Sequence, residues 1–552
     1  MTGFSNSTKR IFASGSDFVD GILTTAAWAD ATIYYAFSVS AAAYNYSQLG
    51  DLPANFNTMT DKMKTAAHAV LSADIGPKAS AGFSFEGLTL QDVESRGDQN
   101  SQFAEIRLAE TSSSDSPTAR VADFPQNNGT FDIDDNGDVW FGTVENYRDA
   151  QAGNFGWINF YHEIGHALGL AHGHTTFDDG LTRKLPDDFD SMEYSVMTYR
   201  SYVGHDGNNY QNEQWGYAQS FMMADIAALQ YVYGADFTTN SGNTTYKWDP
   251  TTGETLVNGA AGISPGANRI FATIWDGNGN DTYDLSAYRD DVTVDLTPGS
   301  YSVFGDAQLA KLGNDTFARG NIFNALLYFE DTRSLIENAI GGTGDDWLIG
   351  NSARNKLTGN GGHDTLQSSD GNDQLFGGFG NDTLFGESGN DGLFGGAGKD
   401  VMIGGFGNDA MRGADGNDKL YGNSGNDVLN GGKNADKIFG AVGKDTLFGG
   451  DGTDKLLGGG GVDRLDGGKG NDILTGGKGA DVFVYNGNQN QGHDTIKGFQ
   501  NGKDIIEISG KIQFRDLDIS RKGGDTIITW QDSRIDLDGI TGQIDRGDFD
   551  FV

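Results

Sequence analysis

Between residues 346 and 483 the chain repeats a nine-residue unit that keeps two positions strictly fixed. An aspartate, replaced once by Asn355, recurs every nine residues through sixteen consecutive units, and an apolar residue always follows two positions later. The unit reads GGxGxDxUx, with U apolar, as in GFGNDTLFGESGNDGLFGG at residues 378–396. Such a period predicts a parallel β-roll, because the stacked units share a thin core that no single unit can bury.

The polar positions of the unit predict calcium sites at its turns. Glycines permit a positive φ and let backbone carbonyls approach an ion closely, and the aspartate adds a charged oxygen. Oxygen-only ligands on a flexible loop suit Ca²⁺, so we expect several structural calcium ions. The predicted calcium-binding residues are the aspartates of the repeat: Asp346, Asp364, Asp373, Asp382, Asp391, Asp400, Asp409, Asp418, Asp427, Asp436, Asp445, Asp454, Asp463, Asp472 and Asp481.

The charge of the chain supports the same interpretation. It carries 77 acidic against 38 basic residues, a formal net charge of -39. Aspartates stacked in register repel one another without a counterion, so we expect the roll to be disordered in the absence of calcium. A disordered Gly/Asp/Asn linker is the alternative, but low complexity does not keep an apolar residue in every unit. The acidity also argues against nucleic acid as a partner, since phosphate binding needs a basic surface.

Composition sets further limits. The chain has no cysteine, which excludes disulfides and thiolate metal sites. The N-terminal stretch MTGFSNSTKRIFASGSDFVDG lacks a basic region followed by an apolar core, so no cleaved signal peptide is expected. No apolar run approaches the length of a membrane span.

The stretch HEIGHALGLAHGH, residues 162–174, carries the predicted chemistry. His162 and His166 are four residues apart, so on a helix they share one face and can bind one metal ion. Gly169 lets the chain leave that helix, and His172 can then return as a third imidazole. Three neutral imidazoles leave one position on Zn²⁺ open for water, which is typical of a catalytic site.

Glu163 stands between the first two histidines, beside the metal rather than on it. The predicted mechanism is attack of metal-bound water on a peptide carbonyl, because zinc lowers the pKa of the water and polarises the carbonyl. Glu163 can take the proton of the water and later deliver it to the leaving amine. The alternative, an amphipathic helix with incidental histidines, leaves this convergence without a reason.

A second element lies downstream in YSVMTY, residues 194–199. Met197 is predicted to lie beneath the metal as the floor of a Met-turn, and Tyr199 could reach the metal or a developing oxyanion. A methionine between tyrosines is more often part of a core. Its position 25 residues after His172 favours the Met-turn.

These motifs together resemble the serralysins, secreted alkaline metalloproteases of bacteria within the metzincin clan. The repeat looks like the RTX repeats of proteins exported by type I secretion. The resemblance also includes WADATIYYAF, GDVWFG, LQYVYGAD, WDGNGNDTYDLSAY, ENAIGGTGDDWLIGNSARNKLTG and GHDTIKGFQNGKDIIEI. Two features depart from the family: Gly173 stands where many members have proline, and sixteen units make a long roll.

The resemblance implies roles for individual residues. Glu163 is then the general base, the three histidines bind zinc, and Tyr199 is a further ligand that moves to support the transition state. RVADFP, residues 120–125, looks like the edge strand along which the family lays an extended peptide, and Ala122 and Phe124 are the expected substrate contacts.

The resemblance also implies partners and a location. Protein or peptide substrates, the type I secretion machinery and a protein protease inhibitor are the expected partners of a monomer. The last residues, Asp548–Val552 (DFDFV), are similar to the end of type I secretion signals. The expected location is extracellular.

Composition shifts and the resemblance together predict a multidomain chain: an α/β zincin-like (metzincin) catalytic domain followed by an all-β C-terminal domain with a calcium-binding parallel β-roll. The expected parts are a short N-terminal segment and possible propeptide (1–20), the catalytic domain (21–235), a β-rich connecting region (236–340), the roll (341–484) and a β cap (485–552).

The predicted function is that of a secreted, calcium-stabilised zinc endopeptidase. The alternative is an RTX surface or adhesion protein whose protease domain is inactive or secondary. A calcium-dependent polysaccharide-modifying enzyme is disfavoured, since the sequence offers no second catalytic constellation.

Overall fold

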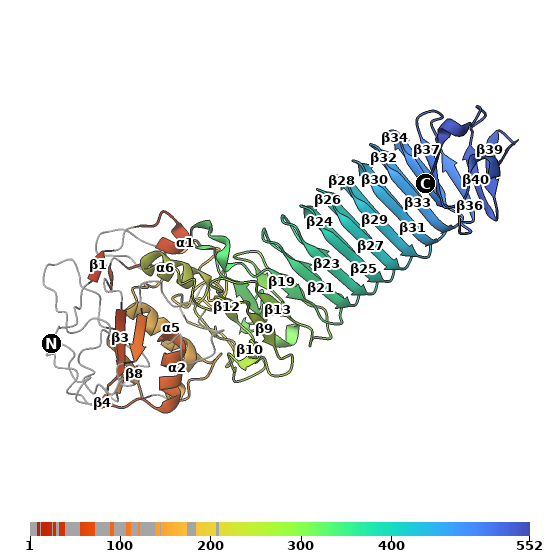
Figure 1. The fold of residues 1–552 in the computed structure, drawn as a ribbon. Helices are drawn as coiled ribbons and strands as arrows, with labels where there is room; N and C mark the ends of the chain where they lie inside the picture. Colours follow the sequence, from red (N-terminus) through yellow and green to blue (C-terminus); the bar gives the residue numbers. More distant parts are fainter. Residues whose placement is uncertain are drawn as a thin grey trace. The chain divides into compact units, whose positions relative to one another are not determined.

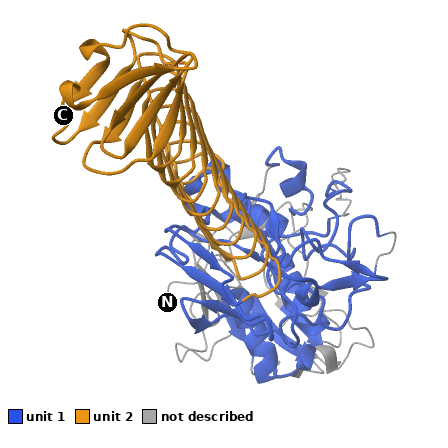
Figure 2. Ribbon diagram, turned by 90° about the vertical axis from the view of Figure 1, so that its right-hand side faces the viewer, with its two compact units in different colours: residues 1–287, 296–336 blue, residues 288–295, 337–552 orange. Residues whose placement is uncertain are grey.

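The computed structural model describes most of the chain and divides it into two compact units. Residues 1–287 and 296–336 form the first unit, and residues 288–295 and 337–552 form the second (Figure 2). Within the described part, no helix is both long and apolar enough to span a membrane. The finer five-part division expected from the sequence stays a prediction. The described residues are 8–10, 13–24, 26–28, 32–38, 56–71, 89–92, 106–111, 120–121, 138–143, 145–173, 184–205 and 209–552.

A mostly parallel sheet organises the N-terminal half of the first unit, in the strand order β5-β3-β6-β8-β7, with β4 paired antiparallel to β6. Its central strands are apolar because both faces are covered: Leu108 of β6 and Phe141 of β8 are fully buried. Strand β7 pairs antiparallel with β8 and closes one edge. The strands are β3 (Thr32–Phe37), β4 (Phe56–Asn57), β5 (Thr89–Asp92), β6 (Ile106–Thr111), β7 (Arg120–Val121) and β8 (Asp138–Gly142).

Helix α5 (Phe155–Ala167) packs on this sheet and carries the metal-binding motif (Figure 1). The side chain of Asn154 caps its N-terminus and accepts a hydrogen bond from the Trp157 amide at 2.8 Å. Phe160 of α5 stacks on Phe141 of β8, with ring centroids 4.1 Å apart. The other α-helices within the described residues are α1 (Asp17–Asp20), α2 (Asp61–Leu71), α4 (Glu145–Arg148) and α6 (Met223–Tyr233).

Short strands complete the first unit. Strands β11, β10, β9 and β13 pair in that order, and β12, β18 and β15 form a three-stranded sheet. Two pairs of strands stand apart, β1 with β2 and β16 with β17. Their bounds are β1 (Thr8–Arg10), β2 (Ala26–Trp28), β9 (Thr245–Trp248), β10 (Thr255–Val257), β11 (Ala260–Ala261), β12 (Ala272–Ile274), β13 (Thr282–Asp284), β15 (Tyr301–Ser302), β16 (Lys311–Gly313), β17 (Thr316–Phe317) and β18 (Ile322–Asn324).

The second unit is the predicted parallel β-roll, and its all-β architecture is confirmed (Figure 1). Each repeat strand pairs in parallel with the strand two along the chain, so that Leu357 lies beside Leu375 and Leu366 beside Leu384. Two units therefore complete one turn of eighteen residues. The apolar residue after each aspartate points inward and is buried, as in Leu420 and Ile438.

The roll has two parallel ladders, which we call the odd and the even ladder. The odd ladder contains β19 (Asn338–Ile340), β21 (Lys356–Gly361), β23 (Gln374–Phe379), β25 (Gly392–Ala397), β27 (Ala410–Asp415), β29 (Val428–Lys433), β31 (Thr446–Gly452), β33 (Arg464–Gly470), β35 (Val482–Asn486), β37 (Ile505–Ser509) and β41 (Phe549–Phe551). The even ladder contains β14 (Thr293–Asp295), β20 (Trp347–Ile349), β22 (Thr365–Gln367), β24 (Thr383–Ser388), β26 (Val401–Phe406), β28 (Lys419–Ser424), β30 (Lys437–Val442), β32 (Lys455–Gly460), β34 (Ile473–Lys478), β36 (His493–Lys497) and β40 (Ser533–Asp538), and ends in antiparallel β39 (Asp525–Trp530) and β38 (Asp518–Lys522).

Candidate functional site

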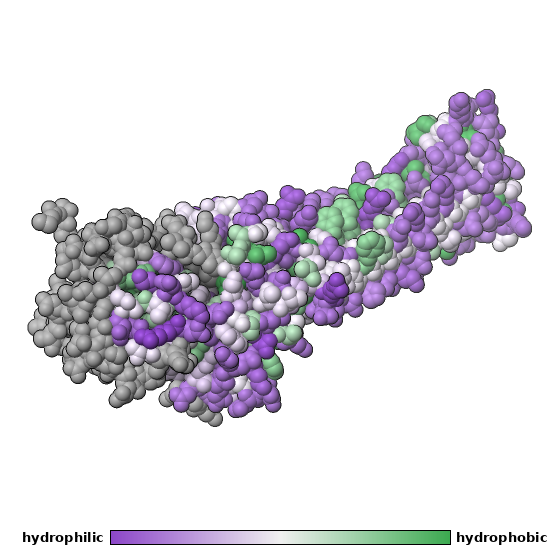
Figure 3. Space-filling view, turned by 90° about the horizontal axis from the view of Figure 1, so that it is seen from below, coloured by the Kyte–Doolittle hydropathy of each residue, from purple (hydrophilic) through white to green (hydrophobic). Residues whose placement is uncertain are grey.

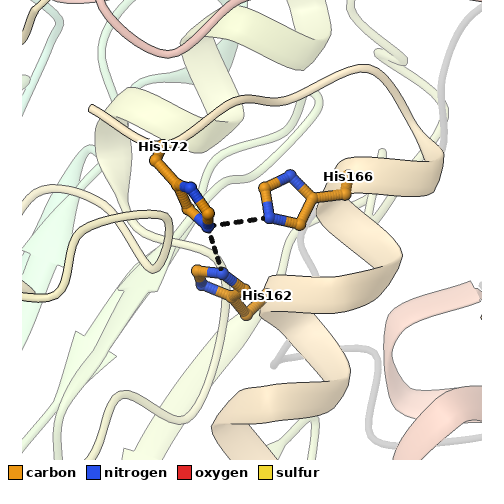
Figure 4. A group of neighbouring side chains, drawn as sticks. All are labelled: His162, His166 and His172. Carbon is orange, nitrogen blue, oxygen red and sulfur yellow. Dashed lines mark hydrogen bonds between the residues drawn. The ribbon is translucent and has the colours of Figure 1, made fainter. Parts of the chain in front are cut away.

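Three imidazoles converge at the end of helix α5 (Figure 4). Nε2 of His172 lies 3.0 Å from Nε2 of His162 and 3.0 Å from Nε2 of His166. The two helix histidines are one turn apart, and Gly169, with φ of 99°, turns the chain so that His172 faces them. The structure thus brings together the three residues that the motif singled out.

The opposite ring nitrogens fix the orientation of two of these rings. Nδ1 of His162 donates to the carbonyl of Val196 at 2.8 Å, and Nδ1 of His166 donates to the carbonyl of Leu170 at 2.8 Å. Because a carbonyl only accepts, each Nδ1 carries the proton and each Nε2 presents a lone pair. This pairing is typical of imidazoles that bind metals.

The donor set fits a zinc ion. Tetrahedral Zn–N bonds of about 2.0–2.1 Å place two nitrogens roughly 3.3 Å apart, close to the separations found here. Three neutral nitrogens with no cysteine among them match the donors of a catalytic zinc site, which keeps one position open. The three histidines could therefore hold the predicted ion without rearranging the helix.

Glu163 lies on the same helix next to the first histidine and is largely buried. Burial raises the pKa of its carboxyl to about 8. A cation held by the imidazoles would favour the charged form and oppose this shift. A carboxyl balanced in this way suits an exchange of protons with a bound water.

Tyr199 lies beside His172, and Met197 packs against helix α5 at Gly165, while their roles in a Met-turn stay predictions. The Tyr199 hydroxyl is 2.9 Å from Nε2 of His172, and burial together with the charge of Glu163 raises its pKa. Met197 is fully buried, and a Cβ on Gly165 would lie only 2.9 Å from its sulfur. Gly165, which has no Cβ, therefore lets helix α5 approach the turn that contains Met197.

One important residue escapes the sequence motifs. Asp225, in the first turn of α6, is completely buried. It accepts hydrogen bonds from the amides of Val196 (2.8 Å) and Met222 (2.9 Å) and from the Ser195 hydroxyl (2.6 Å). It therefore fixes the backbone of the turn whose carbonyl orients His162. Its only sequence signal is an aspartate within an apolar helix, MADIAALQ.

The expected substrate contacts Ala122 and Phe124 lie outside the described residues, next to strand β7 (Arg120–Val121). Their role stays a prediction of the sequence.

In the roll, the repeated aspartates form a ladder of hydrogen bonds. From Asp364 onward, one oxygen of each carboxylate accepts from the amide of the residue eighteen positions earlier, as Asp382 Oδ1 does from Asp364 at 2.9 Å. That residue is an aspartate except for Asn355, which donates to Asp373. The other oxygen, Oδ2, is buried and has no hydrogen-bond partner among the described residues from Asp364 onward. Asp346 differs, because its Oδ2 accepts from the Gly342 amide at 2.6 Å.

The surroundings of these oxygens fit a cation. A Cβ on Gly377 would lie 2.4 Å from Oδ2 of Asp382 and 2.7 Å from the carbonyl oxygen of Gly395. A carboxylate and a carbonyl oxygen thus face one small space that only glycine leaves open. Oxygen donors of this kind are the ligands that Ca²⁺ prefers. Without an ion, burial raises the pKa of Asp391 to about 6 and that of Asp436 to about 7.

The ladder continues past the repeats that the sequence counts. Asp494 accepts from the amide of Asp472 at 2.9 Å, and Asp504 accepts from that of Asp481 at 3.1 Å. These partners are 22 and 23 residues apart instead of eighteen, which hides them from a search at fixed period. The signal that remains is the apolar residue two positions later, Ile496 or Ile506, which is fully buried.

Comparisons with known proteins point to one family. The sequence model of the family described as Peptidase M10 serralysin C terminal matches residues 235–537. Metallopeptidase AprA of Pseudomonas marginalis is 32% identical over 230 residues, which is 40% of this chain and 43% of that protein. Serralysin B of Dickeya chrysanthemi is 30% identical over 314 residues, 56% of this chain and 59% of that protein. The chain therefore spans about half the length of these curated relatives.

A solved structure of a Ca²⁺-dependent, β-helical antifreeze protein from an Antarctic bacterium is 17% identical, with a TM-score of 0.21 over 44% of this chain and 70% of that chain. That likeness is too low to carry an argument.

Proposed function

Because this chain belongs to the serralysin family of peptidases, we propose that it is a secreted, zinc-dependent endopeptidase whose roll binds calcium. The observation that carries the proposal is the convergence of three imidazole nitrogens. Nε2 of His172 lies 3.0 Å from Nε2 of His162 and 3.0 Å from Nε2 of His166. The fold of the first unit, a sheet with the motif helix packed on it, is consistent with a zincin domain.

The residues around the site have distinct tasks in this proposal. Zinc, when bound, would polarise the scissile carbonyl and lower the pKa of a water. The Glu163 carboxylate takes a proton from the water as the water oxygen adds to the carbonyl carbon. It returns that proton to the amide nitrogen as the C–N bond breaks, so one acid and one amine leave.

Tyr199 supports the same step from the other side. Its hydroxyl, 2.9 Å from Nε2 of His172, lies close enough to donate to the oxygen that becomes negative. Burial raises its pKa, so it keeps its proton at neutral pH and can donate it in a hydrogen bond. Met197 and Gly165 contribute packing beneath the histidines and touch no reacting atom.

Substrate choice and export are further parts of the proposal. An extended peptide would lie along the edge that includes Arg120–Val121, with Ala122 and Phe124 as contacts. Type I export, a protein inhibitor and a monomeric state rest on the family alone.

The test is casein hydrolysis in saturating calcium by the wild type and by Glu163→Gln, with zinc content measured on both. We expect the variant to retain zinc and to lose at least about a thousandfold in rate, since it removes the general base. Glu387→Gln, an exposed change in the roll, is the matched control and should leave the rate unchanged.

A zinc-selective chelator should abolish the activity, and added zinc should restore it, while excess calcium keeps the roll folded. A folded wild type that holds zinc and cuts neither casein nor short peptides would overturn the proposal. The surface-protein alternative would then be preferred.

A further inference from the structure

Three lysines form a column on the outer face of the even ladder. Lys419, Lys437 and Lys455 occupy the same position of strands β28, β30 and β32, in parallel register, and all three are exposed. None of them makes an ion pair with any residue that the structure describes. Neighbouring strands are about 4.8 Å apart, so three like charges in succession destabilise the free surface. This column is positively charged, although the chain as a whole carries a net charge of -39.

An apolar column runs beside the lysines. Tyr421, Phe439 and Leu457 lie two residues further along the same strands and therefore on the same face. The rings of Tyr421 and Phe439 stack in parallel, with centroids 4.9 Å apart and 5° between their planes. Their outer faces remain partly exposed, so each offers a flat apolar surface next to a charge.

The apolar column borders a shallow groove. Phe385, Ile403 and the 71% exposed Phe406 line it together with Gly405, Asn423, Ser424 and the acidic Glu387. The groove therefore has apolar walls and polar groups that can make hydrogen bonds. Figure 3 shows apolar residues interrupting the hydrophilic surface along the roll.

We propose that this lysine-aromatic face, defined by Lys419, Lys437, Lys455, Tyr421 and Phe439, binds an anionic polysaccharide. Uronate carboxylates would pair with the lysines, and the apolar faces of the sugar rings would stack on the aromatic side chains. Both partners are repetitive along one direction, so successive sugars meet successive strands. The inference is independent of peptide hydrolysis and would hold the protein on an acidic matrix.

The same features argue against other ligands. The strands beneath this face are internal to the ladder and have paired backbones, so a peptide cannot add to them as a further strand. The side chains alone must therefore recognise the ligand, and they place positively charged ammonium groups beside aromatic rings.

The first experiment measures binding of the full chain, in saturating calcium, to fluorescent oligogalacturonate too short to gel with calcium. The comparison probe is the same oligomer with its carboxylates reduced to alcohols. We expect the charged oligomer to bind at least roughly tenfold more tightly and to weaken as salt is raised.

Matched variants locate the site. Lys419→Gln/Lys437→Gln/Lys455→Gln should weaken binding roughly tenfold, as expected for three exposed ion pairs. The charge control, Lys356→Gln/Lys433→Gln/Lys469→Gln, removes three lysines from the odd ladder and should leave affinity within about twofold of the wild type.

The aromatic part has its own control. Tyr421→Thr/Phe439→Thr should weaken binding roughly tenfold, since each stacked sugar ring loses its partner. Phe376→Thr/Phe394→Thr removes an equal stacked pair, 4.9 Å and 5°, from the odd ladder and should leave binding unchanged. Circular dichroism during calcium titration confirms that each variant folds.

Several results would overturn the proposal. They are absence of binding, equal affinity for the reduced oligomer, or equal losses in the even-ladder and odd-ladder variants. Sedimentation provides a further check: if the wild type associates with itself and the lysine variant does not, the face is an interface between copies and not a polysaccharide site.

Discussion

The carbonyl oxygen of Val196 accepts a hydrogen bond from Nδ1 of His162 at 2.8 Å, while the amide of the same valine donates to Asp225. One residue of the turn that contains Met197 thus connects a buried carboxylate to a predicted metal ligand through its two backbone groups. The orientation of His162 depends on the position of that turn. We therefore expect Asp225 to act as a positioning residue, through the turn and not by direct contact with the histidines.

The substitution Asp225→Asn tests this relationship. An amide cannot accept from all three donors, and a donor left unpaired in a buried site costs about 1–3 kcal/mol of unfolding free energy. Loss of support behind a ligand typically lowers metal affinity about 10–100-fold. Competition with a chromogenic zinc chelator measures the affinity, and urea unfolding measures the stability.

Asp315→Asn is the control, because it makes the same chemical change at an exposed side chain of the same unit. It should leave zinc affinity unchanged. Equal zinc affinity in Asp225→Asn and the wild type would show that the carboxylate stabilises the unit without positioning His162.

A second prediction concerns Gly165 and Met197. Alanine normally stabilises a helix relative to glycine, by about 1 kcal/mol. Here a new Cβ would lie 2.9 Å from the Met197 sulfur and 3.4 Å from side-chain carbons of Leu170 and Phe221. Gly165→Ala should therefore destabilise the unit by about 1–3 kcal/mol.

The double variant Gly165→Ala/Met197→Val supplies the control for that change. A shorter residue at 197 makes room for the new methyl group, so the two losses of stability should not add. Additive losses in urea unfolding would show that the methionine sulfur does not limit the approach of the helix.

A third prediction links pH to calcium. Without an ion, burial holds the pKa of the roll aspartates above the ordinary value of 3.8, at about 6 for Asp391 and about 7 for Asp436. The folded roll then binds more protons than the unfolded chain. Its calcium-free stability is greatest below about pH 4 and is lost as pH rises through 6 to 7.

Calcium binding has the opposite dependence, because protons compete for the same carboxylates. The calcium concentration at half-folding should rise as pH falls below 6, whereas roll structure in a chelator should increase. Circular dichroism of calcium titrations across this range measures both. A half-folding concentration independent of pH would contradict the argument.

A fourth prediction concerns left-handed residues in the repeat. Ala441 has φ of 81° at a position where most units have glycine. An alanine in this conformation costs about 1 kcal/mol, so Ala441→Gly should stabilise the roll by a similar amount. The urea midpoint at fixed calcium concentration is the measurement.

The reverse change provides the comparison. Gly450 has φ of 111°, and a Cβ there would lie 2.0 Å from the carbonyl oxygen of Gly432. Gly450→Ala should lower the urea midpoint and cost more than about 1 kcal/mol. If both substitutions lowered the urea midpoint, backbone conformation would not be the main influence of residue 441 on the stability of the roll.

The roll could be predicted from the sequence because one local rule, an apolar residue two positions after each aspartate, fixes both strand and register. That rule still holds at Asp494 and Asp504, but the fixed period fails there, because insertions lengthen the turn while the contact persists. A fixed period detects only units that are equally spaced along the sequence, whereas the hydrogen-bonded ladder depends on which residues are neighbours in the folded chain.

Part of the candidate metal centre could likewise be predicted from the sequence, and part of it could not. The helical spacing of His162 and His166 and the turn at Gly169 follow from eleven consecutive residues, and the structure brings these histidines together with His172. Asp225 is 29 residues from Val196, and no local pattern predicts that pairing. The close approach of Gly165 to Met197 likewise depends on tertiary packing.

The register of eighteen residues per turn also constrains how such a roll can change in length during evolution. Loss or duplication of a single nine-residue unit would transfer every later strand to the opposite ladder. The lysines at 419, 437 and 455 would then face the other side, and the cap beginning near β36 would meet the wrong partner. Genes for this architecture should therefore gain and lose repeats in pairs, so that faces with different surface chemistry are inherited intact.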